Sequence, residues 1–369
     1  MPQPLNGLVI LDLTQARGGP FAALSLGELG AKVIKVERPG TGDAGRAVPP
    51  FKSGKSALFA AQNHGKASIA LDLRSETDRT TFERLLARAD VLLENFRPGA
   101  LERLGYGWEA LHAAYPGLIY GALSGFGQTG PEATRPGYSG IAAARAGQMG
   151  QGRTGQAEVA GLYLAQGVLA ALYDRSTTGR GRRVDVSLLD TEFALLGPAF
   201  AAAAAGSKTP EEGAPPPFAP VETLEAADGA FVLAAASDKL FEKLCIALAL
   251  PLSEDPRFAR PEARCANARL LKRLIEAVTL EQTRSHWLQK LTAAGIPAAP
   301  IQSLDQAMKD PQLLARTMVV DVLDRNGRKA HLAPGNPIKI SGAEDRSARG
   351  PAPDLDGNRG EVLRWLDEA

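Results

Sequence analysis

Short hydrophobic runs alternate with helical patterns along the first third of the chain. Runs rich in β-branched residues at 7–13 and 31–37 flank a helical pattern at 21–30, and a strand, a helix and a strand in this order form a βαβ unit. The alternation continues with predicted strands at 68–73, 91–94 and 118–124 and predicted helices at 76–89 and 108–115. Because a crossover between parallel strands needs a helix to return the chain, the pattern predicts an α/β domain whose parallel sheet is covered on both faces.

The pattern changes in the second half of the chain. After an apolar helix at 161–174 and a strand at 184–188, residues 206–220 hold two glycines, five prolines and two acids, a composition typical of an exposed linker. A strand pair at 222–235 and helices at 238–250, 262–278 and 281–294 follow, then strand-like segments at 318–322 and 335–341 and a short helix at 362–366. We therefore expect a large domain at 1–205, a linker at 206–220, a smaller α+β domain at 221–316 and a return segment to the large domain at 317–369.

Composition and charge exclude several classes of protein. With 369 residues, 44% of them hydrophobic, the chain is long enough to bury one large core and a smaller one. Its 42 basic and 41 acidic residues are interleaved, so no basic stripe is present to bind a nucleic-acid backbone. Residues 1–6 do not resemble a signal peptide, and the apolar run at 200–205 is too short to span a membrane. We expect a cytoplasmic protein without nucleic-acid or membrane partners.

The two cysteines do not indicate a metal site. Cys245 and Cys265 both lie in predicted helices, with no CxxC spacing and no histidine-rich cluster nearby. We interpret both as reduced thiols of the core, and we expect no bound metal.

Arginines and a glycine-rich turn suggest a phosphate-binding region. The loop at 15–20 (QARGGP) joins the first strand to a helix, where open α/β sheets bind anionic ligands. Its sequence lacks the G-x-G-x-x-G of dinucleotide-binding folds, which argues against NAD. A guanidinium group suits phosphate oxygens, although any single surface arginine is more often simply solvated. Four arginines flank predicted strand or helix ends: Arg38, Arg74, Arg97 and Arg103.

Nine strings along the chain resemble the family III CoA-transferases. They lie at 19–22 (GPFA), 29–40 (LGAKVIKVERPG), 68–73 (SIALDL), 94–105 (ENFRPGALERLG), 124–131 (SGFGQTGP), 178–181 (TGRG), 255–258 (DPRF), 294–298 (AGIPA) and 335–339 (GNPIK). This is the CaiB/BaiF superfamily, which contains formyl-CoA transferase, carnitine CoA-transferase and α-methylacyl-CoA racemase.

The resemblance implies a Rossmann-like large domain and a homodimer whose two subunits interlock like chain links. It also implies an active site near the subunit boundary, with CoA as a substrate and no metal. Arg17 stands where sequences similar to formyl-CoA transferase carry Gln. Carried over by position, the expected CoA contacts are Arg17, Arg38, Leu71, Asp72, Leu73, Arg74, Asn95, Phe96, Arg97 and Arg103.

The family's nucleophile is missing from its expected position. In the transferases an aspartate ahead of the apolar helix attacks the acyl-CoA thioester, forming a covalent intermediate. When Gly161 and Gly167 are aligned with the family's two glycines, Ala157 takes the place of that aspartate, and Glu158 follows it. Glu158, which is one methylene longer, is our candidate catalytic carboxylate. The alternative is that this acid only interacts favourably with the helix dipole.

Three functions are consistent with these residues. The first is a CoA-transferase that moves CoA from an acyl-CoA to a free carboxylic acid through Glu158. The second is racemase-like proton exchange, but the family's histidine would fall in the loop at 137–140, and none of the four histidines, at 64, 112, 286 and 331, lies there. The third is a catalytically inactive CoA-binding paralogue, which Ala157 favours. The sequence does not identify the acid substrate.

Overall fold

The computed structural model of the chain describes residues 3–52, 54–149, 155–206 and 215–368. The chain forms two compact units, which we call the large unit (Met1–Ala201 with Pro311–Ala369) and the small unit (Ala202–Asp310). Residues 207–214 of the expected linker lie outside the described residues. The final segment of the chain therefore belongs to the same unit as the first.

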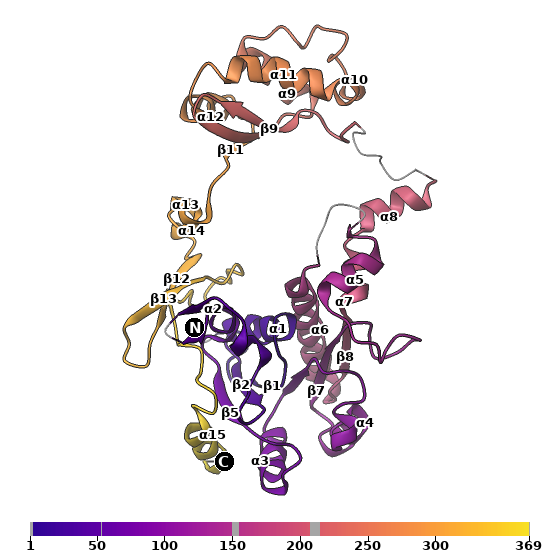
Figure 1. Cartoon of the computed structure of the whole chain (residues 1–369), viewed down its shortest axis with the longest axis vertical. Helices are drawn as coiled ribbons and strands as arrows, with labels where there is room; N and C mark the ends of the chain where they lie inside the picture. The colour runs from indigo at the N-terminus through magenta and orange to yellow at the C-terminus, as the bar shows by residue number, and fades with distance from the viewer. Residues whose placement is uncertain (1–2, 53, 150–154, 207–214, 369) are drawn as a thin grey trace. The chain divides into compact units, whose positions relative to one another are not determined.

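A six-stranded parallel sheet forms the centre of the large unit (Figure 1). Its strand order is β5-β2-β1-β6-β7-β8. The strands are β5 (Ala67–Ala70), β2 (Lys32–Glu37), β1 (Val9–Asp12), β6 (Val91–Glu94), β7 (Ile119–Ser124) and β8 (Arg183–Ser187). The chain builds outward from β1 on one side and from β6 on the other, so the order reverses between these two strands. In open α/β sheets, ligands bind at the carboxyl ends of the strands beside such a reversal.

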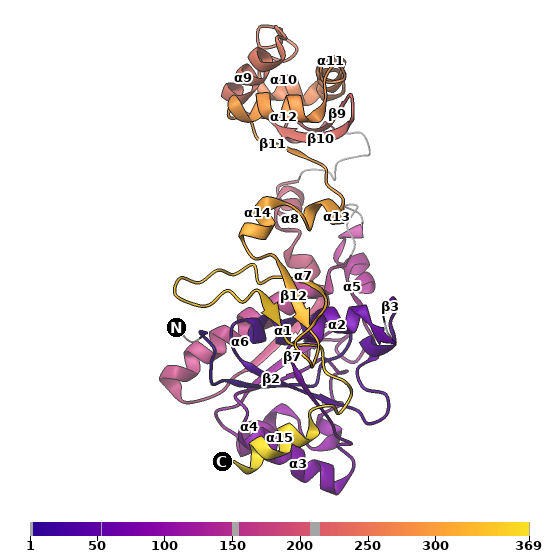
Figure 2. The ribbon, with the colours of Figure 1, turned by 90° about the vertical axis from the view of Figure 1, so that its left-hand side faces the viewer.

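Helices cover both faces of this sheet. On one face, Ala22 and Leu26 of α1 pack with Leu164 of α6 against Ile10 and neighbouring strand residues. The other face is covered by α3, α4 and α15, so the C-terminal helix lies beside α3 (Figure 2). The helices are α1 (Gly18–Glu28), α6 (Ala157–Thr178), α3 (Glu76–Ala87), α4 (Trp108–Ala114) and α15 (Arg359–Asp367). Alternate strand residues point to opposite faces, which explains why Leu11 packs on the α3 side and Ile10 on the α1 side.

Shorter elements complete the large unit. A second sheet has the order β13-β12-β14, and β3 pairs with β4. These elements are β12 (Val319–Leu323), β13 (Lys329–Pro334), β14 (Ala348–Arg349), β3 (Phe51–Lys52), β4 (Lys55–Ser56), α2 (Ala57–Asn63), α5 (Ser139–Ala146), α7 (Leu188–Ala194), α14 (Pro311–Ala315) and two 3-10 turns (Ala44–Ala47 and Glu102–Leu104). Helix α8 (Gly197–Ala204) spans the boundary between the units.

The small unit is an antiparallel sheet packed against helices. Its strand order is β11-β10-β9, and its core includes Phe231, Phe241, Phe258 and Trp287. The elements are β9 (Val221–Ala226), β10 (Gly229–Ala234), β11 (Ala298–Pro300), α9 (Asp238–Leu248), α10 (Pro261–Ala266), α11 (Ala268–Thr279), α12 (Arg284–Ala293) and α13 (Leu304–Ala307).

The predicted α/β class with a parallel sheet is confirmed, and three local predictions are wrong. The single helix expected at 262–278 is two helices, interrupted at Asn267, whose side-chain amide donates to the carbonyl oxygens of Arg257 and Ala263. Residues 335–341 form no strand, because Pro337 has no N–H to donate to a neighbouring strand. Both cysteines are free, but Cys265 is only half-buried.

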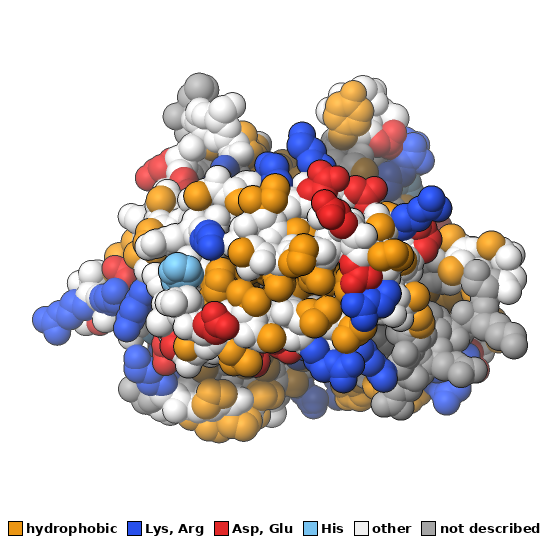
Figure 3. Space-filling model, turned by 90° about the horizontal axis from the view of Figure 1, so that it is seen from above, with side chains coloured by type: hydrophobic (Ala, Val, Ile, Leu, Met, Phe, Trp, Pro, Cys, Tyr) orange, Lys and Arg blue, Asp and Glu red, His pale blue; other side chains and the backbone are white. Residues whose placement is uncertain are grey.

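The surface carries charges of both signs. On the face seen in Figure 3, basic and acidic side chains are interspersed between hydrophobic patches. Among the described residues, no helix is both long and apolar enough to cross a bilayer, and no group of three or more His, Cys, Asp or Glu side chains is arranged to hold a metal ion.

Candidate active site

The loop between β1 and α1 is fixed in place by hydrogen bonds from two other loops. Ala16 has a φ of 66°, a left-handed conformation that is unfavourable for alanine and needs support from its surroundings. Its N–H donates to Oδ1 of Asp43 at 2.8 Å. Gln15 donates its N–H to Oδ1 of Asn95 and accepts from Nδ2 of Asn95, both at 2.8 Å. The loops that follow β1 and β6 are thereby joined at the point where the strand order reverses.

Beneath this loop lies a buried network of charged side chains. The Lys66 ammonium donates to Oδ2 of Asp12 at 2.8 Å, and the Lys35 ammonium lies 2.9 Å from Oδ2 of Asp43 and 2.7 Å from the Thr14 carbonyl oxygen. Burial lowers the pKa of Lys66 to about 8, although Asp12 opposes this shift. Burial alone would raise the pKa of Asp12, but the positive charges of Lys35 and Lys66 have the larger combined effect, so this pKa is lowered overall. Paired in this way, the buried charges hold the loop from below.

A cavity of about 270 Å³ opens at the carboxyl ends of β1, β2, β5 and β6. Leu13, Thr14 and Gln15 of the β1–α1 loop line one side. The expected CoA contacts that line it are Arg38, Leu71, Asp72, Leu73, Arg74 and Phe96. Residues far apart in the sequence are thus brought together at the edge of the sheet where open α/β folds bind nucleotides.

The other expected CoA contacts lie outside the lining of this cavity. Asn95 uses its side chain to hold Gln15, and Arg17 contacts Glu158. Arg97 and Arg103 are exposed, as are Arg38 and Arg74. Within the described part of the chain, the side chains of these four arginines form no hydrogen bond or ion pair, so their guanidinium groups are free to bind phosphate oxygens. The contact of each of these residues with CoA stays a prediction.

Glu158 forms an ion pair with Arg17 at the start of α6. It lies in the first turn of the helix. Both Nε and Nη2 of Arg17 lie 2.7 Å from Oε1 of Glu158. The side-chain amide of Gln62, from α2, donates to the same oxygen at 3.2 Å. Among the described residues, none hydrogen-bonds to Oε2 of Glu158, so this oxygen is available to another group.

Two glycines allow this arrangement. A Cβ on Gly161 would lie 2.3 Å from the carbonyl oxygen of Gly18, and a Cβ on Gly18 would lie 2.5 Å from the carbonyl oxygen of Ala157. No side chain is tolerated at such distances without movement of the backbone, so α1 and α6 make backbone contact near their first turns. Because Arg17 precedes α1 and Glu158 lies in the first turn of α6, this close approach brings the two side chains together.

Three residues of the site were not predicted from the sequence. Asp43 and Gln62 act through loop and side-chain contacts whose partners are distant in the chain. Glu94 ends β6 and is buried, which raises its pKa to about 7, while hydrogen bonds from the Phe96 N–H and the Tyr120 hydroxyl partly counteract the rise. Only the position of Glu94, directly before Asn95 and Phe96, could have drawn attention to it.

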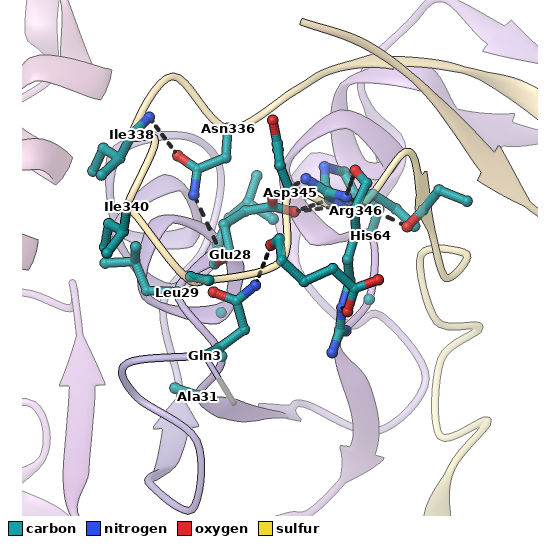
Figure 4. A pocket seen from close by; sticks show the side chains of 18 of the residues that line it. Gln3, Glu28, Leu29, Ala31, His64, Asn336, Ile338, Ile340, Asp345 and Arg346 are labelled. Carbon is teal, nitrogen blue, oxygen red and sulfur yellow. Dashed lines mark hydrogen bonds and ion pairs between the residues drawn. The ribbon is translucent and has the colours of Figure 1, made fainter. Parts of the chain in front are cut away.

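A second cavity, of about 540 Å³, lies at the other end of α1. Figure 4 shows the segment that contains Asn336 and Arg346 folding over Glu28, and Asn336 donates to the Glu28 carbonyl oxygen at 3.4 Å. Arg349 forms an ion pair with the Glu28 carboxylate. Burial lowers the pKa of His64, which lines this cavity, to about 4, so its imidazole is neutral at physiological pH. The contacts attach the return segment to α1.

Comparisons with known proteins find similarity along nearly the whole chain. The family model for CoA-transferase family III matches residues 5–359. The acetyl-CoA:oxalate CoA-transferase of Acetobacter aceti is 39% identical over 98% of this chain and 95% of its own length. The human succinyl-CoA:glutarate CoA-transferase is 32% identical over 100% of this chain and 88% of its own length.

Solved structures give the same result. A CaiB/BaiF family protein from Brucella suis superimposes with a TM-score of 0.86 and 35% identity, covering 100% of both chains. A protein from Mycobacterium tuberculosis, solved as an aspartate-to-alanine mutant, has a TM-score of 0.84 and 31% identity over 97% of this chain and 98% of its own. The match along nearly the whole chain, together with the cavity at the reversal of strand order, shows that this protein belongs to CoA-transferase family III.

Proposed function

We propose that this protein transfers CoA between an acyl-CoA thioester and a free carboxylic acid, with the Glu158 carboxylate as the nucleophile. The observation that carries this proposal is the position of Glu158 at the start of α6, with one oxygen bound by Arg17 and Gln62 and the other unoccupied by any described side chain. Family membership and relatives named for this reaction support the activity.

The acyl-CoA is expected to lie along the β1–α1 loop. Its nucleotide would occupy the cavity lined by Arg38, Arg74 and Phe96. The same loop contributes Gln15 to that cavity and, two residues later, Arg17 to the contact with Glu158. A continuous loop therefore connects the proposed nucleotide site with the proposed nucleophile, and holding a thioester beside a carboxylate in this way lowers the entropic barrier to attack.

Covalent catalysis by a carboxylate proceeds through balanced exchanges. Oε2 of Glu158 attacks the thioester carbon, the C–S bond breaks, and CoA thiolate leaves behind a mixed anhydride. The thiolate then attacks Cδ of Glu158, which releases the donor acid and forms a glutamyl-CoA thioester. The acceptor carboxylate then attacks Cδ of this thioester, which releases CoA thiolate and forms a second mixed anhydride. The thiolate attacks the carbonyl carbon of the acceptor, so the acceptor leaves as its CoA thioester and the Glu158 carboxylate is restored. No proton is gained or lost, and each step is easier than direct exchange.

The relatives suggest the class of acid. They are named for oxalate and for glutarate, and we infer that short dicarboxylic acids are substrates of this protein too. Acetyl-CoA and succinyl-CoA, which appear in the same names, are the first donors to test.

A catalytically inactive CoA-binding protein is the second candidate. Ala157 favours it, because this residue starts α6 where the sequence alignment places the family's aspartate, and it has no functional group. The two candidates differ in one respect only, which is whether Glu158 reacts.

Transfer assays on matched variants test the proposal. Wild type, Glu158→Gln and Glu109→Gln are each incubated with acetyl-CoA or succinyl-CoA and with oxalate, succinate or glutarate. Glu109 is an exposed glutamate of α4 without a described side-chain contact, and its variant should match wild type. We expect Glu158→Gln to lose at least 1,000-fold in kcat, roughly the effect of removing a nucleophile. Equal rates in Glu158→Gln and wild type would refute the role of Glu158.

We further propose that the protein is a cytoplasmic homodimer. Several large hydrophobic side chains of α6, α7 and α8 are exposed, and exposed apolar groups of this size favour a protein interface. They are Leu162, Tyr163, Tyr173, Phe193 and Phe200. A second copy of the chain would cover them, as expected for interlocked subunits. Light scattering after size-exclusion chromatography should give twice the chain mass of 38.8 kDa.

A further inference from the structure

Arg17 binds the carboxylate of Glu158 through one oxygen only. Nε and Nη2 of Arg17 both lie 2.7 Å from Oε1, and the Gln62 amide lies 3.2 Å from the same atom. The side chain of Arg17 is 54% exposed, and that of Glu158 is 27% exposed. A half-exposed guanidinium group therefore faces the carboxylate that our proposed function assigns to the reaction.

We propose, on the basis of that function, that Arg17 is the binding group for the carboxylate of the acid substrate. In the resting enzyme, the guanidinium of Arg17 binds Glu158. When Glu158 carries a covalently attached group, the guanidinium binds the free acid instead. Arg17 is thus a determinant of acid binding, a role distinct from the CoA contact expected from the sequence.

The charges that appear and disappear during the reaction support this exchange. When Oε2 of Glu158 has been acylated, the side chain is a neutral anhydride, and Arg17 loses its anionic partner. When CoA thiolate attacks Cδ, the bond from Cδ to Oε2 breaks, and the donor acid leaves as a carboxylate that carries this oxygen. The negative charge that left Glu158 with the CoA thiolate in the first step is thereby placed on the departing acid, beside Arg17. The incoming acid brings the same charge to the same place.

The chemistry of the guanidinium group suits this task. Arginine presents a planar fork of N–H donors that matches a carboxylate, and it stays protonated throughout the reaction. Among the described residues, none forms a hydrogen bond or ion pair with Nη1 of Arg17, so a further donor is available. A glutamine at this position would offer only the two N–H donors of a single amide nitrogen and would carry no charge.

The backbone beneath Arg17 is fixed while its side chain is exposed. The N–H of the preceding residue, Ala16, is held by Asp43, and Gln15 is held by Asn95. Arg17 itself starts from the N-cap position of α1, with no side-chain cap hydrogen bond. The guanidinium can therefore move by side-chain rotation alone, without a change in the loop that lines the nucleotide cavity.

The dicarboxylates named for the relatives strengthen the inference. During the anhydride steps the reacting carboxylate of an acid is neutral, but the second carboxylate of a dicarboxylic acid remains charged. Arg17 could therefore bind a dicarboxylic acid throughout the reaction cycle. It could bind a monocarboxylic acid only at the start and the end of the cycle, when the acid is a free carboxylate. We expect dicarboxylic acids to depend more strongly on Arg17 than acetate does.

Steady-state kinetics on full-length variants test this inference. KM for the acid (oxalate, succinate, glutarate or acetate) and KM for acetyl-CoA or succinyl-CoA are measured for wild type, Arg17→Gln, Arg17→Lys and Arg182→Gln. Arg182 is the matched control, because it is 59% exposed and pairs through Nε with Asp174 at 2.7 Å at the other end of α6. We expect Arg17→Gln to raise KM for dicarboxylic acids about 10-fold to 100-fold, as loss of a charged hydrogen bond does.

The remaining results should separate acid binding from CoA binding. KM for the acyl-CoA should change less than about 3-fold in Arg17→Gln, Arg17→Lys should recover part of the acid affinity, and Arg182→Gln should match wild type, since exposed pairs contribute little. The inference is overturned if KM for every acid stays within twofold of wild type in Arg17→Gln, or if KM for the acyl-CoA rises as much as KM for the acid.

A second measurement distinguishes failure of this inference from failure of the proposed function. Wild type and Arg17→Gln are incubated with acyl-CoA without any acid, and the peptide that contains Glu158 is analysed by mass spectrometry. An adduct in both proteins with an unchanged acid KM refutes only the role of Arg17. The absence of adduct and turnover in wild type refutes the proposed function, and this inference with it. If Arg17→Gln does not fold, the same comparison is made with Arg17→Lys.

Discussion

Gly161 lies so close to Gly18 that a Cβ on Gly161 would be 2.3 Å from the Gly18 carbonyl oxygen. This contact between α1 and α6 is what places Glu158 beside Arg17, because each of these side chains lies within a turn of one of the glycines. The position of the proposed nucleophile therefore depends on backbone packing, and the consequences can be measured.

Gly161→Ala should force the two helices apart. The added methyl group meets a backbone oxygen that cannot rotate away, and overpacking of this kind costs about 1–3 kcal/mol of unfolding free energy. We expect a lower Tm together with a loss of transferase activity larger than the stability change explains. Gly140→Ala is the control, since its Cβ would meet no atom within 4 Å. A Gly161→Ala protein with unchanged Tm and activity would show that the helices are not in this contact.

Arg38→Ala and Arg74→Ala should weaken binding of the acyl-CoA. Both arginines line the smaller cavity and are exposed, and loss of one charged hydrogen bond to a phosphate costs about 1.5–3 kcal/mol. KM for the acyl-CoA should rise about 10-fold or more in each, with less effect on KM for the acid. Arg273→Ala, an exposed arginine of α11 in the small unit, should be neutral. Calorimetric titration with CoA provides an independent measurement, and equal affinity in all variants would exclude this cavity as the nucleotide site.

Glu94 should make stability depend on pH. Burial raises its pKa to about 7 in the folded protein, from 4.5, so the folded state binds more protons than the unfolded state between these values. The contribution of Glu94 to the stability of the folded protein is fully present below about pH 4.5 and is lost as pH rises through 7. Glu94→Gln, which imitates the protonated acid, should therefore be more stable than wild type at pH 8 and nearly equal at pH 5.

Chemical denaturation at the two pH values checks this expectation. The difference in unfolding free energy between wild type and Glu94→Gln should change between the two pH values by no more than about 3 kcal/mol. The shift in the pKa of Glu94 sets this upper limit. Glu109→Gln, a substitution at an exposed site, should show no such change. An identical difference at both pH values would mean that Glu94 titrates normally.

The sequence predicted the large unit well because its signals are local. Strands β1 and β6 each begin with three consecutive apolar residues, and buried parallel strands need such runs. Arg38 and Arg74 could be assigned to one region because each follows a predicted strand, and the carboxyl ends of parallel strands meet at one edge of the sheet. Phe96 was expected only from the resemblance to the family.

The remaining features depend on contacts that local patterns do not encode. Gln62 reaches Glu158 across 96 positions in the sequence, and Asp43 supports Ala16 from another loop. The segment at 335–341 has strand-like composition, but it packs over the end of α1 through Asn336. In the same way, the pairing of Arg17 with Glu158 follows from the crossing of two helices and not from the residues around either one.

The most direct test of the central claim is to detect the covalent intermediate on Glu158. Wild-type protein is incubated with acetyl-CoA or succinyl-CoA, treated or not with hydroxylamine, digested, and analysed by peptide mass spectrometry beside Glu158→Gln. We predict a hydroxylamine-sensitive adduct on Glu158 in wild type and none in the variant. A protein that turns over acyl-CoA while this peptide stays unmodified, or a Glu158→Gln variant that reacts as fast as wild type, would contradict the claim.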